Sequence, residues 1–235
     1  MTPEEKKLWL EQRKQHLTAS DVAAVLDFNP YCPRQRVFEE KVSGVTKDLD
    51  GMSTVESGQF MESGIFNWFM HHLKQRAPNA NGHLWGKNSE GIDQPGFSQF
   101  LCKSPVWPVL AATPDGICWS PHLTAVECKN TGHLNQWQKT LPAGLPRPTT
   151  AWIHDRQGYR EERSLSAPSY YVPQLLVQMH VLGAPQGVIV GLVGGQTRVE
   201  CYYAADEGWI QEHLPELKTF WQKVLDAREE FSQNV

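Results

Sequence analysis

Apolar residues recur at helical spacing in several segments of the chain. In residues 55–75 they include Ile65, Phe69 and Leu73, a spacing that predicts an amphipathic helix packed on a sheet. The same criterion predicts a helix at 170–182, just before Gly183, a residue typical of helix C-termini. Further helices are predicted at about 3–15, 21–26, 33–42 and 134–141, and at 206–231 with a break or kink near Pro215.

Between residues 97 and 128 the pattern changes to short β-type runs separated by turn residues. Strands are predicted at 97–101, 106–112, 116–119 and 124–128, with a later pair at 188–193 and 197–203 and a hairpin turn at 155–158. This order of helices and strands predicts an α/β (α+β) fold with a mixed central β-sheet flanked by helices. We expect the whole chain, 1–235, to form a single domain.

The amino-acid composition indicates a globular protein and argues against several other classes of protein. The chain has 235 residues, of which 40% are hydrophobic and 20% charged, as in ordinary globular proteins. It shows neither an apolar run long enough for a membrane helix nor a signal peptide, so we expect a cytoplasmic protein without a membrane partner. The five cysteines form no C-x-x-C pair, which argues against a zinc ribbon and a disulfide framework and favours reduced thiols. A net charge of −4 means that any DNA-binding surface must be a local basic patch or a metal-neutralised cleft.

The strongest chemical signal lies in the predicted meander. Asp115 is on a Pro-Asp-Gly turn, and Glu127 and Lys129 are two residues apart in a strand, so that their side chains share one face. Two carboxylates beside the backbone carbonyl of Cys128 form an oxygen-rich pocket suited to Mg²⁺ or Mn²⁺. Lys129 at the same pocket can orient or deprotonate a metal-activated water and stabilise negative charge on a phosphate. The alternative is an ordinary hairpin turn beside an exposed charge pair.

Four segments, in order, carry a resemblance to a known family. They are LTASDVAAVLDFNPY (17–31), GQFME (58–62), TPDG with VECK (113–116 and 126–129) and YVPQLLVQMHVLG (171–183). Together they resemble the YqaJ-type viral recombinases, the group that includes the lambda exonuclease family, within the P-D-(D/E)-x-K nuclease superfamily. The resemblance implies the restriction-endonuclease-like fold of that superfamily.

The resemblance also implies roles for individual residues. Asp115 and Glu127 would be metal ligands, Lys129 the catalytic lysine, and Glu62 an additional acidic residue that reaches the site from the long helix. A solvated helix glutamate is the alternative for Glu62.

A glutamine on the 170–182 helix lines the active site in this family. Gln174 is the preferred candidate, and Gln178, one turn later on the same face, is the other. Glutamine is also common on amphipathic helices without any such role.

In the lambda exonuclease type, an arginine and a serine seven residues apart bind the 5′-terminal phosphate, and Arg13 and Ser20 match this spacing. A guanidinium and a serine at a helix N-terminus are suited to phosphate. Thr113 would face the same pocket. The alternative makes Arg13 a solvated helix residue and Ser20 an N-cap, for which Thr18 is also a candidate.

These observations predict a metal-dependent exonuclease that digests linear double-stranded DNA from 5′ to 3′ and leaves 3′ overhangs for phage-type recombination. The resemblance implies Mg²⁺, expected as two ions and replaceable by Mn²⁺, a homotrimeric ring, and a single-strand annealing protein as partner, in a phage- or prophage-encoded protein of the bacterial cytosol. The alternatives are a structure- or sequence-specific endonuclease and a non-catalytic DNA-binding module. Digestion of linear but not circular duplex would separate an exonuclease from an endonuclease.

Overall fold

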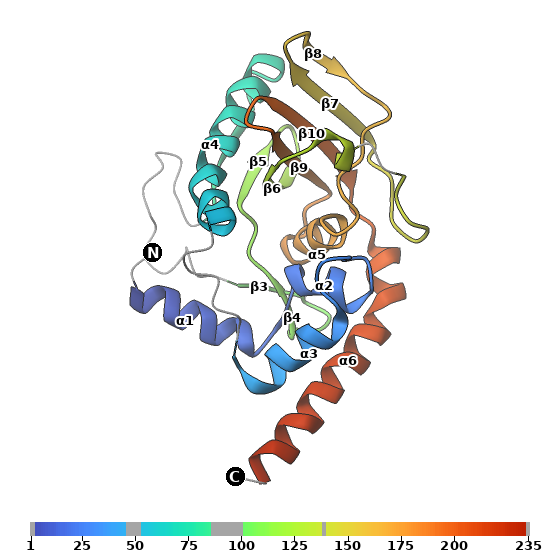
Figure 1. The fold of residues 1–235 in the computed structure, drawn as a ribbon. Coiled ribbons are helices and arrows are strands. Elements are labelled where there is room, and N and C mark those ends of the chain that lie inside the picture. The colour runs from blue at the N-terminus through green and yellow to red at the C-terminus, as the bar shows by residue number, and fades with distance from the viewer. Residues whose placement is uncertain (1–2, 46–52, 86–100, 138–139, 234–235) are drawn as a thin grey trace.

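A computed structural model describes residues 3–45, 53–85, 101–137 and 140–233 (Figure 1). The helices are α1 (Pro3–Lys14), α2 (Ala19–Val25), α3 (Arg34–Ser43), α4 (Ser53–Arg76), α5 (Val172–Leu182) and α6 (Glu207–Gln233), with a 3₁₀ turn η1 (Leu134–Trp137). The strands are β1 (Leu17–Thr18), β2 (Asn81–Leu84), β3 (Cys102–Lys103), β4 (Leu110–Ala112), β5 (Gly116–Trp119), β6 (Leu123–Thr131), β7 (Thr150–Asp155), β8 (Gly158–Glu161), β9 (Gln186–Val193) and β10 (Thr197–Ala204).

The central sheet has seven strands in the order β2-β5-β6-β9-β10-β7-β8. Strands β6 and β9 run parallel, whereas every other neighbouring pair in this sheet is antiparallel. The chain passes from β6 to β9 through the β7–β8 hairpin and α5, a crossover that the parallel pairing requires. The predicted mixed sheet flanked by helices is therefore confirmed.

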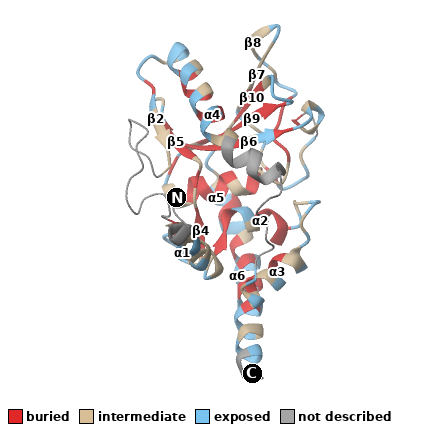
Figure 2. Ribbon diagram, turned by 60° about the vertical axis from the view of Figure 1, so that its left-hand side comes forward, coloured by how far each residue is buried: buried red, intermediate tan, exposed pale blue. Residues whose placement is uncertain are grey.

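Helices cover the sheet on opposite faces (Figures 1 and 2). Ile65 and Phe69 of α4 pack in a core cluster with Val126 of β6, while Leu175 of α5 packs in a second cluster with Ala125. Neighbouring residues of β6 thus face different helices, as the two-residue period of a strand requires. Full burial of a Val, Leu, Ile or Phe side chain stabilises the fold by about 1.5–3 kcal/mol.

Helix α5 presents one face to β6 and carries the two candidate glutamines. Pro173 lies in its first turn, where the missing N–H costs no helical hydrogen bond. Gly183 ends the helix in the left-handed conformation with φ 62°, which a residue without Cβ adopts at little cost. Gln174 and Gln178 are separated by one turn and point to the same side.

A second, small sheet ties the N-terminal segment to the centre of the chain. Leu17 and Thr18 of β1 pair in parallel with Leu110 and Ala111 of β4, which also pairs with β3. This pairing holds the start of α2 beside the segment that leads to Asp115.

Several predicted elements differ in extent. Of the helix predicted at 134–141, residues 134–137 form the short turn η1, and residues 138–139 lie outside the described residues. The strand predicted at 106–112 is reduced to β4. Pro105 and Pro108 explain the shortened strand, because neither can donate to a ladder. Helix α6 continues through Pro215, so the predicted break is absent. Of the strand predicted at 97–101, residues 97–100 lie outside the described residues.

The remaining predictions of secondary structure match closely. Helices α4 and α5, strands β5, β9 and β10, and the β7–β8 hairpin lie where the apolar pattern places them. Helix α2 begins earlier than expected, after Thr18, and Ser20 lies inside its first turn. All five cysteines are free thiols. Among the described residues, no helix has the length and apolarity that crossing a bilayer requires.

Candidate active site

Strand β6 carries the acid and the base of the predicted site. Glu127 is fully buried, whereas the Lys129 side chain is 21% exposed. Lys129 Nζ forms an ion pair and a hydrogen bond with Oε1 of Glu127. The two side chains therefore share one face of the strand, as the sequence predicts.

Both glutamines of α5 donate to the same carboxylate. Gln174 Nε2 lies 2.5 Å from Oε1 of Glu127, and Gln178 Nε2 lies 2.6 Å from Oε2. Both candidate glutamines therefore contact Glu127, and the structure does not favour one over the other. With Lys129 included, this buried carboxylate accepts from three side-chain donors, which compensates for its removal from water.

Asp115 reaches β6 from the turn between β4 and β5. Its Oδ2 accepts a hydrogen bond from the backbone N–H of Cys128 at 2.7 Å, directly between Glu127 and Lys129. This contact fixes the Pro-Asp-Gly turn against the strand, and it would be lost if the turn were only a surface hairpin.

Burial and like charge shape the electrostatics of the site. Burial raises the pKa of Asp115 well above its ordinary value, and the charge of Glu127 adds to this effect. Burial also raises the pKa of Glu62 to about 7, with Lys129 opposing and Glu127 adding to the shift. Burial lowers the pKa of Lys129, but Glu127 and Asp115 outweigh it and raise that pKa above its usual range. Three carboxyl groups therefore surround one ammonium, and Glu62 belongs to the same electrostatic cluster.

The donor chemistry of this cluster fits a hard divalent cation. Asp115, Glu127 and the Cys128 carbonyl offer only oxygen, which Mg²⁺ and Mn²⁺ prefer to the nitrogen and sulfur ligands of zinc sites. Burial is the main cause of the raised carboxyl pKa values, and the charge of Glu127 adds to it, so a bound cation would favour the ionised forms of Asp115 and Glu62. Within the part of the chain that the structure describes, no group of three or more His, Cys, Asp or Glu side chains is already arranged as a ligand cage. Mg²⁺ sites usually rely on one or two carboxylates completed by water and substrate, which agrees with this partial set.

Two buried polar atoms beside the site lack a partner among the described residues. They are the hydroxyl oxygen of Thr113 and Oε1 of Gln178. Gln178 Nε2 also lies 3.5 Å from the Thr113 carbonyl oxygen, so both atoms belong to one small region. Because buried polar groups are normally hydrogen-bonded, these atoms are candidates for contact with a water molecule, to which Oε1 of Gln178 would accept and the Thr113 hydroxyl donate.

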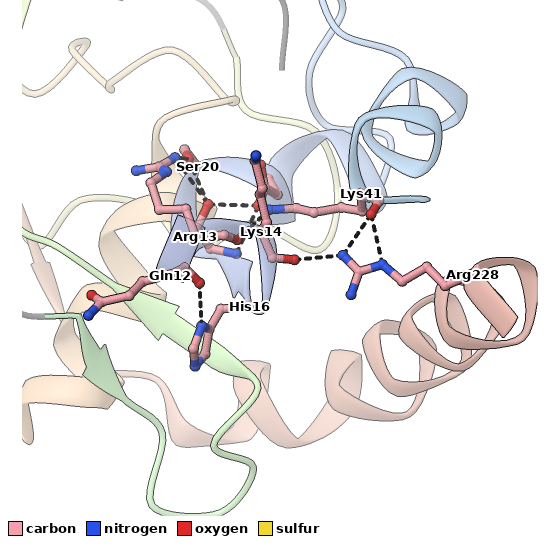
Figure 3. A network of polar contacts seen from close by, with 9 residues as sticks. Gln12, Arg13, Lys14, His16, Ser20, Lys41 and Arg228 are labelled. Carbon is pink, nitrogen blue, oxygen red and sulfur yellow. Dashed lines mark hydrogen bonds and ion pairs between the residues drawn. The ribbon is translucent and has the colours of Figure 1, made fainter. Parts of the chain in front are cut away.

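The predicted phosphate-binding pair also comes together (Figure 3). Arg13 Nη2 donates to Ser20 Oγ at 2.9 Å and to Thr18 Oγ1 at 3.3 Å. The guanidinium lies 4.5 Å from the centre of the Trp9 ring, a cation–π contact. Burial lowers the pKa of Arg13, and the charge of Asp21 opposes that shift. Arg13 is therefore not a freely solvated helix residue.

Lys41 and Arg228, which the sequence did not single out, support this pair (Figure 3). Lys41 Nζ lies 2.8 Å from Oδ2 of Asp21 and donates to the Arg13 carbonyl at 3.1 Å. Arg228 of α6 donates to the Lys41 carbonyl from Nε at 2.9 Å and from Nη2 at 2.6 Å, and to the Lys14 carbonyl at 2.7 Å. Three segments far apart in sequence thus fix the position of Arg13.

Tyr171 is a further neighbour of the site that sequence reasoning left without a role. Its ring centre lies 5.1 Å from Lys129 Nζ, at the residue that precedes α5. Its place three residues before Gln174, in a quoted segment of the family resemblance, is the signal that could have identified it.

The chain is similar to known proteins in sequence and in fold. The model of the YqaJ-like viral recombinase domain matches residues 8–185. Among solved structures, the fold is similar to LHK-Exo, an alkaline exonuclease from Laribacter hongkongensis, with a TM-score of 0.61, 16% identity and coverage of 97% of both chains. The complex of LHK-Exo with dAMP gives a TM-score of 0.62 at the same identity and coverage.

A more distant likeness is to the protein in a SOX–DNA complex, with a TM-score of 0.51, 10% identity, and coverage of 92% of this chain and 67% of that one. No match was found among proteins of curated function. At such identities the structural likeness shows a shared fold, whereas the family match covers most of the chain. The chain therefore belongs to the YqaJ-like viral recombinase family and has the fold of the alkaline exonuclease LHK-Exo.

Proposed function

We propose that the chain is a metal-dependent exonuclease that hydrolyses phosphodiesters of linear double-stranded DNA from 5′ to 3′ and leaves 3′ overhangs. Family membership and fold support a nuclease role. The observation that carries the proposal is the meeting of Asp115, Glu127 and Lys129 at strand β6, with two glutamine amides holding Glu127 in place.

The residues present divide the chemical work. Asp115, Glu127 and the Cys128 carbonyl would hold Mg²⁺ or Mn²⁺, as one or two ions, and Glu62 would complete the acidic pocket. A bound ion supplies a Lewis acid that lowers the pKa of the attacking water. Lys129 stays protonated at neutral pH because its pKa is raised. Its ammonium therefore orients the water and stabilises negative charge on the phosphate, rather than acting as the base.

Recognition of a DNA end follows from the N-terminal pair. Arg13 and Ser20 present a guanidinium and a hydroxyl close to the start of α2, a combination suited to a terminal 5′-phosphate. The β1–β4 pairing holds this pair near the strand that leads to Thr113 and Asp115. The negative net charge of the chain makes such local anchoring necessary.

The assembly and partners are proposed from the family resemblance. We expect a homotrimeric ring around duplex DNA, and a single-strand annealing protein that receives the 3′ overhang. Sedimentation of the purified chain would measure the first expectation, and co-purification with an annealing protein encoded beside it would measure the second.

One assay tests the proposed activity. Linear duplex labelled at the 5′ or the 3′ end is incubated with Mg²⁺, alongside closed circular duplex and a Lys129→Ala control. The proposal expects loss of the 5′ label as mononucleotide, an intact circle and an inactive control. Cleavage of the circle would indicate an endonuclease. DNA binding without any hydrolysis would indicate a non-catalytic module.

A further inference from the structure

A row of three tyrosines leads from the protein surface to Lys129. Tyr31, in the segment between α2 and α3, meets Tyr170 edge to face, with ring centres 5.4 Å apart and planes at 86°. Tyr170 meets Tyr171 with centres 4.3 Å apart. Tyr171 in turn lies 5.1 Å from Lys129 Nζ. The row therefore begins at an exposed ring and ends at the proposed catalytic ammonium.

The segment that carries Tyr31 is held in place by hydrogen bonds. The Tyr31 N–H donates to Oδ1 of Asn29 at 2.9 Å, and Ser169 Oγ donates to the Phe28 carbonyl at 3.3 Å. The second bond links this segment to the residue just before Tyr170. Tyr31 is thus presented by a fixed turn rather than by a free loop end.

Packing does not account for the position of Tyr31. Its side chain is 67% exposed, although an aromatic ring gains free energy by leaving water. In an edge-to-face pair, each ring keeps at least one face that its partner does not cover. Tyr31 therefore offers an aromatic face to solvent at the outer end of the row.

Charge around Tyr31 does not favour a phosphate as its ligand. Arg34 Nη1 pairs with Oε1 of Glu216, and Arg36 Nε pairs with Oε1 of Glu40 at 3.0 Å. The cations that follow Tyr31 in sequence are thus already neutralised, and the surface left to bind a ligand is aromatic. Nucleobases stack on such surfaces irrespective of sequence.

We propose that Tyr31, supported by Tyr170, is a stacking site for an unpaired nucleobase of the DNA end whose backbone lies at Lys129. This inference rests on the proposed function, because it assumes that a DNA end occupies the Lys129 site. It adds a recognition element for the base, which neither the acidic pocket nor the Arg13–Ser20 pair supplies.

A binding experiment tests the site without any catalytic turnover. The full chain, in EDTA, is titrated with a short 5′-phosphorylated duplex that carries 2-aminopurine as an unpaired terminal base. Anisotropy of a distant label reports affinity, and 2-aminopurine fluorescence reports stacking. We compare Tyr31→Ala, Tyr31→Phe, and Phe231→Ala, which removes a similarly exposed ring (65%) at the far end of α6.

The wild type and Tyr31→Phe should quench 2-aminopurine and bind equally well, because both keep the ring. Tyr31→Ala should lose the quenching and bind on the order of ten-fold more weakly, and Phe231→Ala should match the wild type. An abasic terminus should weaken wild-type binding but leave Tyr31→Ala unaffected. If Tyr31→Ala binds and quenches as the wild type does, the stacking site is wrong while the nuclease proposal stands. If the wild type binds no DNA end at all, both proposals fail.

Discussion

The Nε2 atom of Gln178 lies 2.6 Å from Oε2 of Glu127, and both side chains are fully buried. A buried carboxylate without such a donor would pay the full cost of desolvation. The amide therefore offsets part of that cost and fixes Glu127 in one orientation. Gln174 makes the matching contact to Oε1 from a partly exposed position.

The two glutamines should differ when replaced. Gln178→Leu removes a donor from a site that water does not reach, so we expect the free energy of unfolding to fall by about 1–3 kcal/mol. Gln174→Leu should cost less stability, since solvent can replace its donor, while activity falls in both variants. Urea denaturation beside a turnover assay measures the difference. Equal stability of Gln178→Leu and wild type would show that the buried contact contributes little.

Replacement of Lys129 should separate catalysis from metal binding. Lys129→Ala should lower turnover by about 10²–10³-fold, the usual loss when one donor that stabilises the charge of the transition state is removed. Calorimetry should still detect Mg²⁺ binding in this variant, but not in Asp115→Ala or Glu127→Ala. The site is misassigned if Lys129→Ala keeps more than about a tenth of wild-type turnover.

The metal preference should follow from oxygen ligands. Mg²⁺ and Mn²⁺ should support hydrolysis, whereas Ca²⁺ should bind without turnover because it favours larger and less regular coordination. EDTA should stop activity but leave the melting temperature nearly unchanged, since the core clusters consist of apolar side chains, which do not bind an ion. Activity that depended on zinc would contradict the assignment, as would unfolding by EDTA.

The shifted carboxyl pKa values predict a pH dependence of stability. The pKa of Glu62 is about 7 in the folded chain and 4.5 ordinarily. Across this range the folded state retains a proton that the unfolded state has released, so metal-free stability should fall as pH rises from about 4.5 to about 7. Asp115 acts in the same direction. Urea denaturation should show a shallower decline for Glu62→Gln, and Mg²⁺ should restore stability at the upper end. An unchanged slope in Glu62→Gln would contradict the shift.

The Arg13–Ser20 pair should set a preference among DNA ends. Wild type should digest 5′-phosphorylated duplex faster than 5′-hydroxyl duplex, and Arg13→Ala should abolish that preference while metal affinity is retained. Arg163→Ala, which removes a side chain that is 91% exposed, is the matched control and should behave as wild type. If Arg13→Ala still discriminates as strongly as wild type, the anchor lies elsewhere.

The sequence pattern predicted the elements that are marked by regular apolar spacing or by flanking turn residues. Helix α4 follows from apolar spacing, because its buried residues Ile65, Phe69 and Leu73 repeat with the helical period. Strand β5 follows from its β-type residues and the turn residues beside them. Strand β1 was not predicted as a strand. Its two residues form a strand only through a partner at 110–111, and periodicity carries no information about such distant pairing.

The candidate site shows the same limit. Period two places Glu127 and Lys129 on one face, but only the family resemblance suggested that Gln174 would meet them. Arg198 and Glu200 are an opposite case: alternating polar residues on β10 resemble a solvated face, yet both are buried. Arg198 Nη1 donates to the Trp68 carbonyl, which shows that α4 covers this face. The sequence of β10 alone does not indicate that α4 packs over it.

The pairing of β1 with β4 has a consequence for the order of folding. Arg13 and Ser20 can form their contact early, because they are neighbours in sequence. Their distance from Asp115 is fixed only when β4 has been synthesised and has closed a long loop with β1, a step that is slow for contacts so far apart in sequence. A nascent chain that ends before β4 would therefore carry the proposed phosphate-binding residues, Arg13 and Ser20, without a defined position relative to Asp115. The relative position of the Arg13–Ser20 pair and Asp115 is therefore established late in folding.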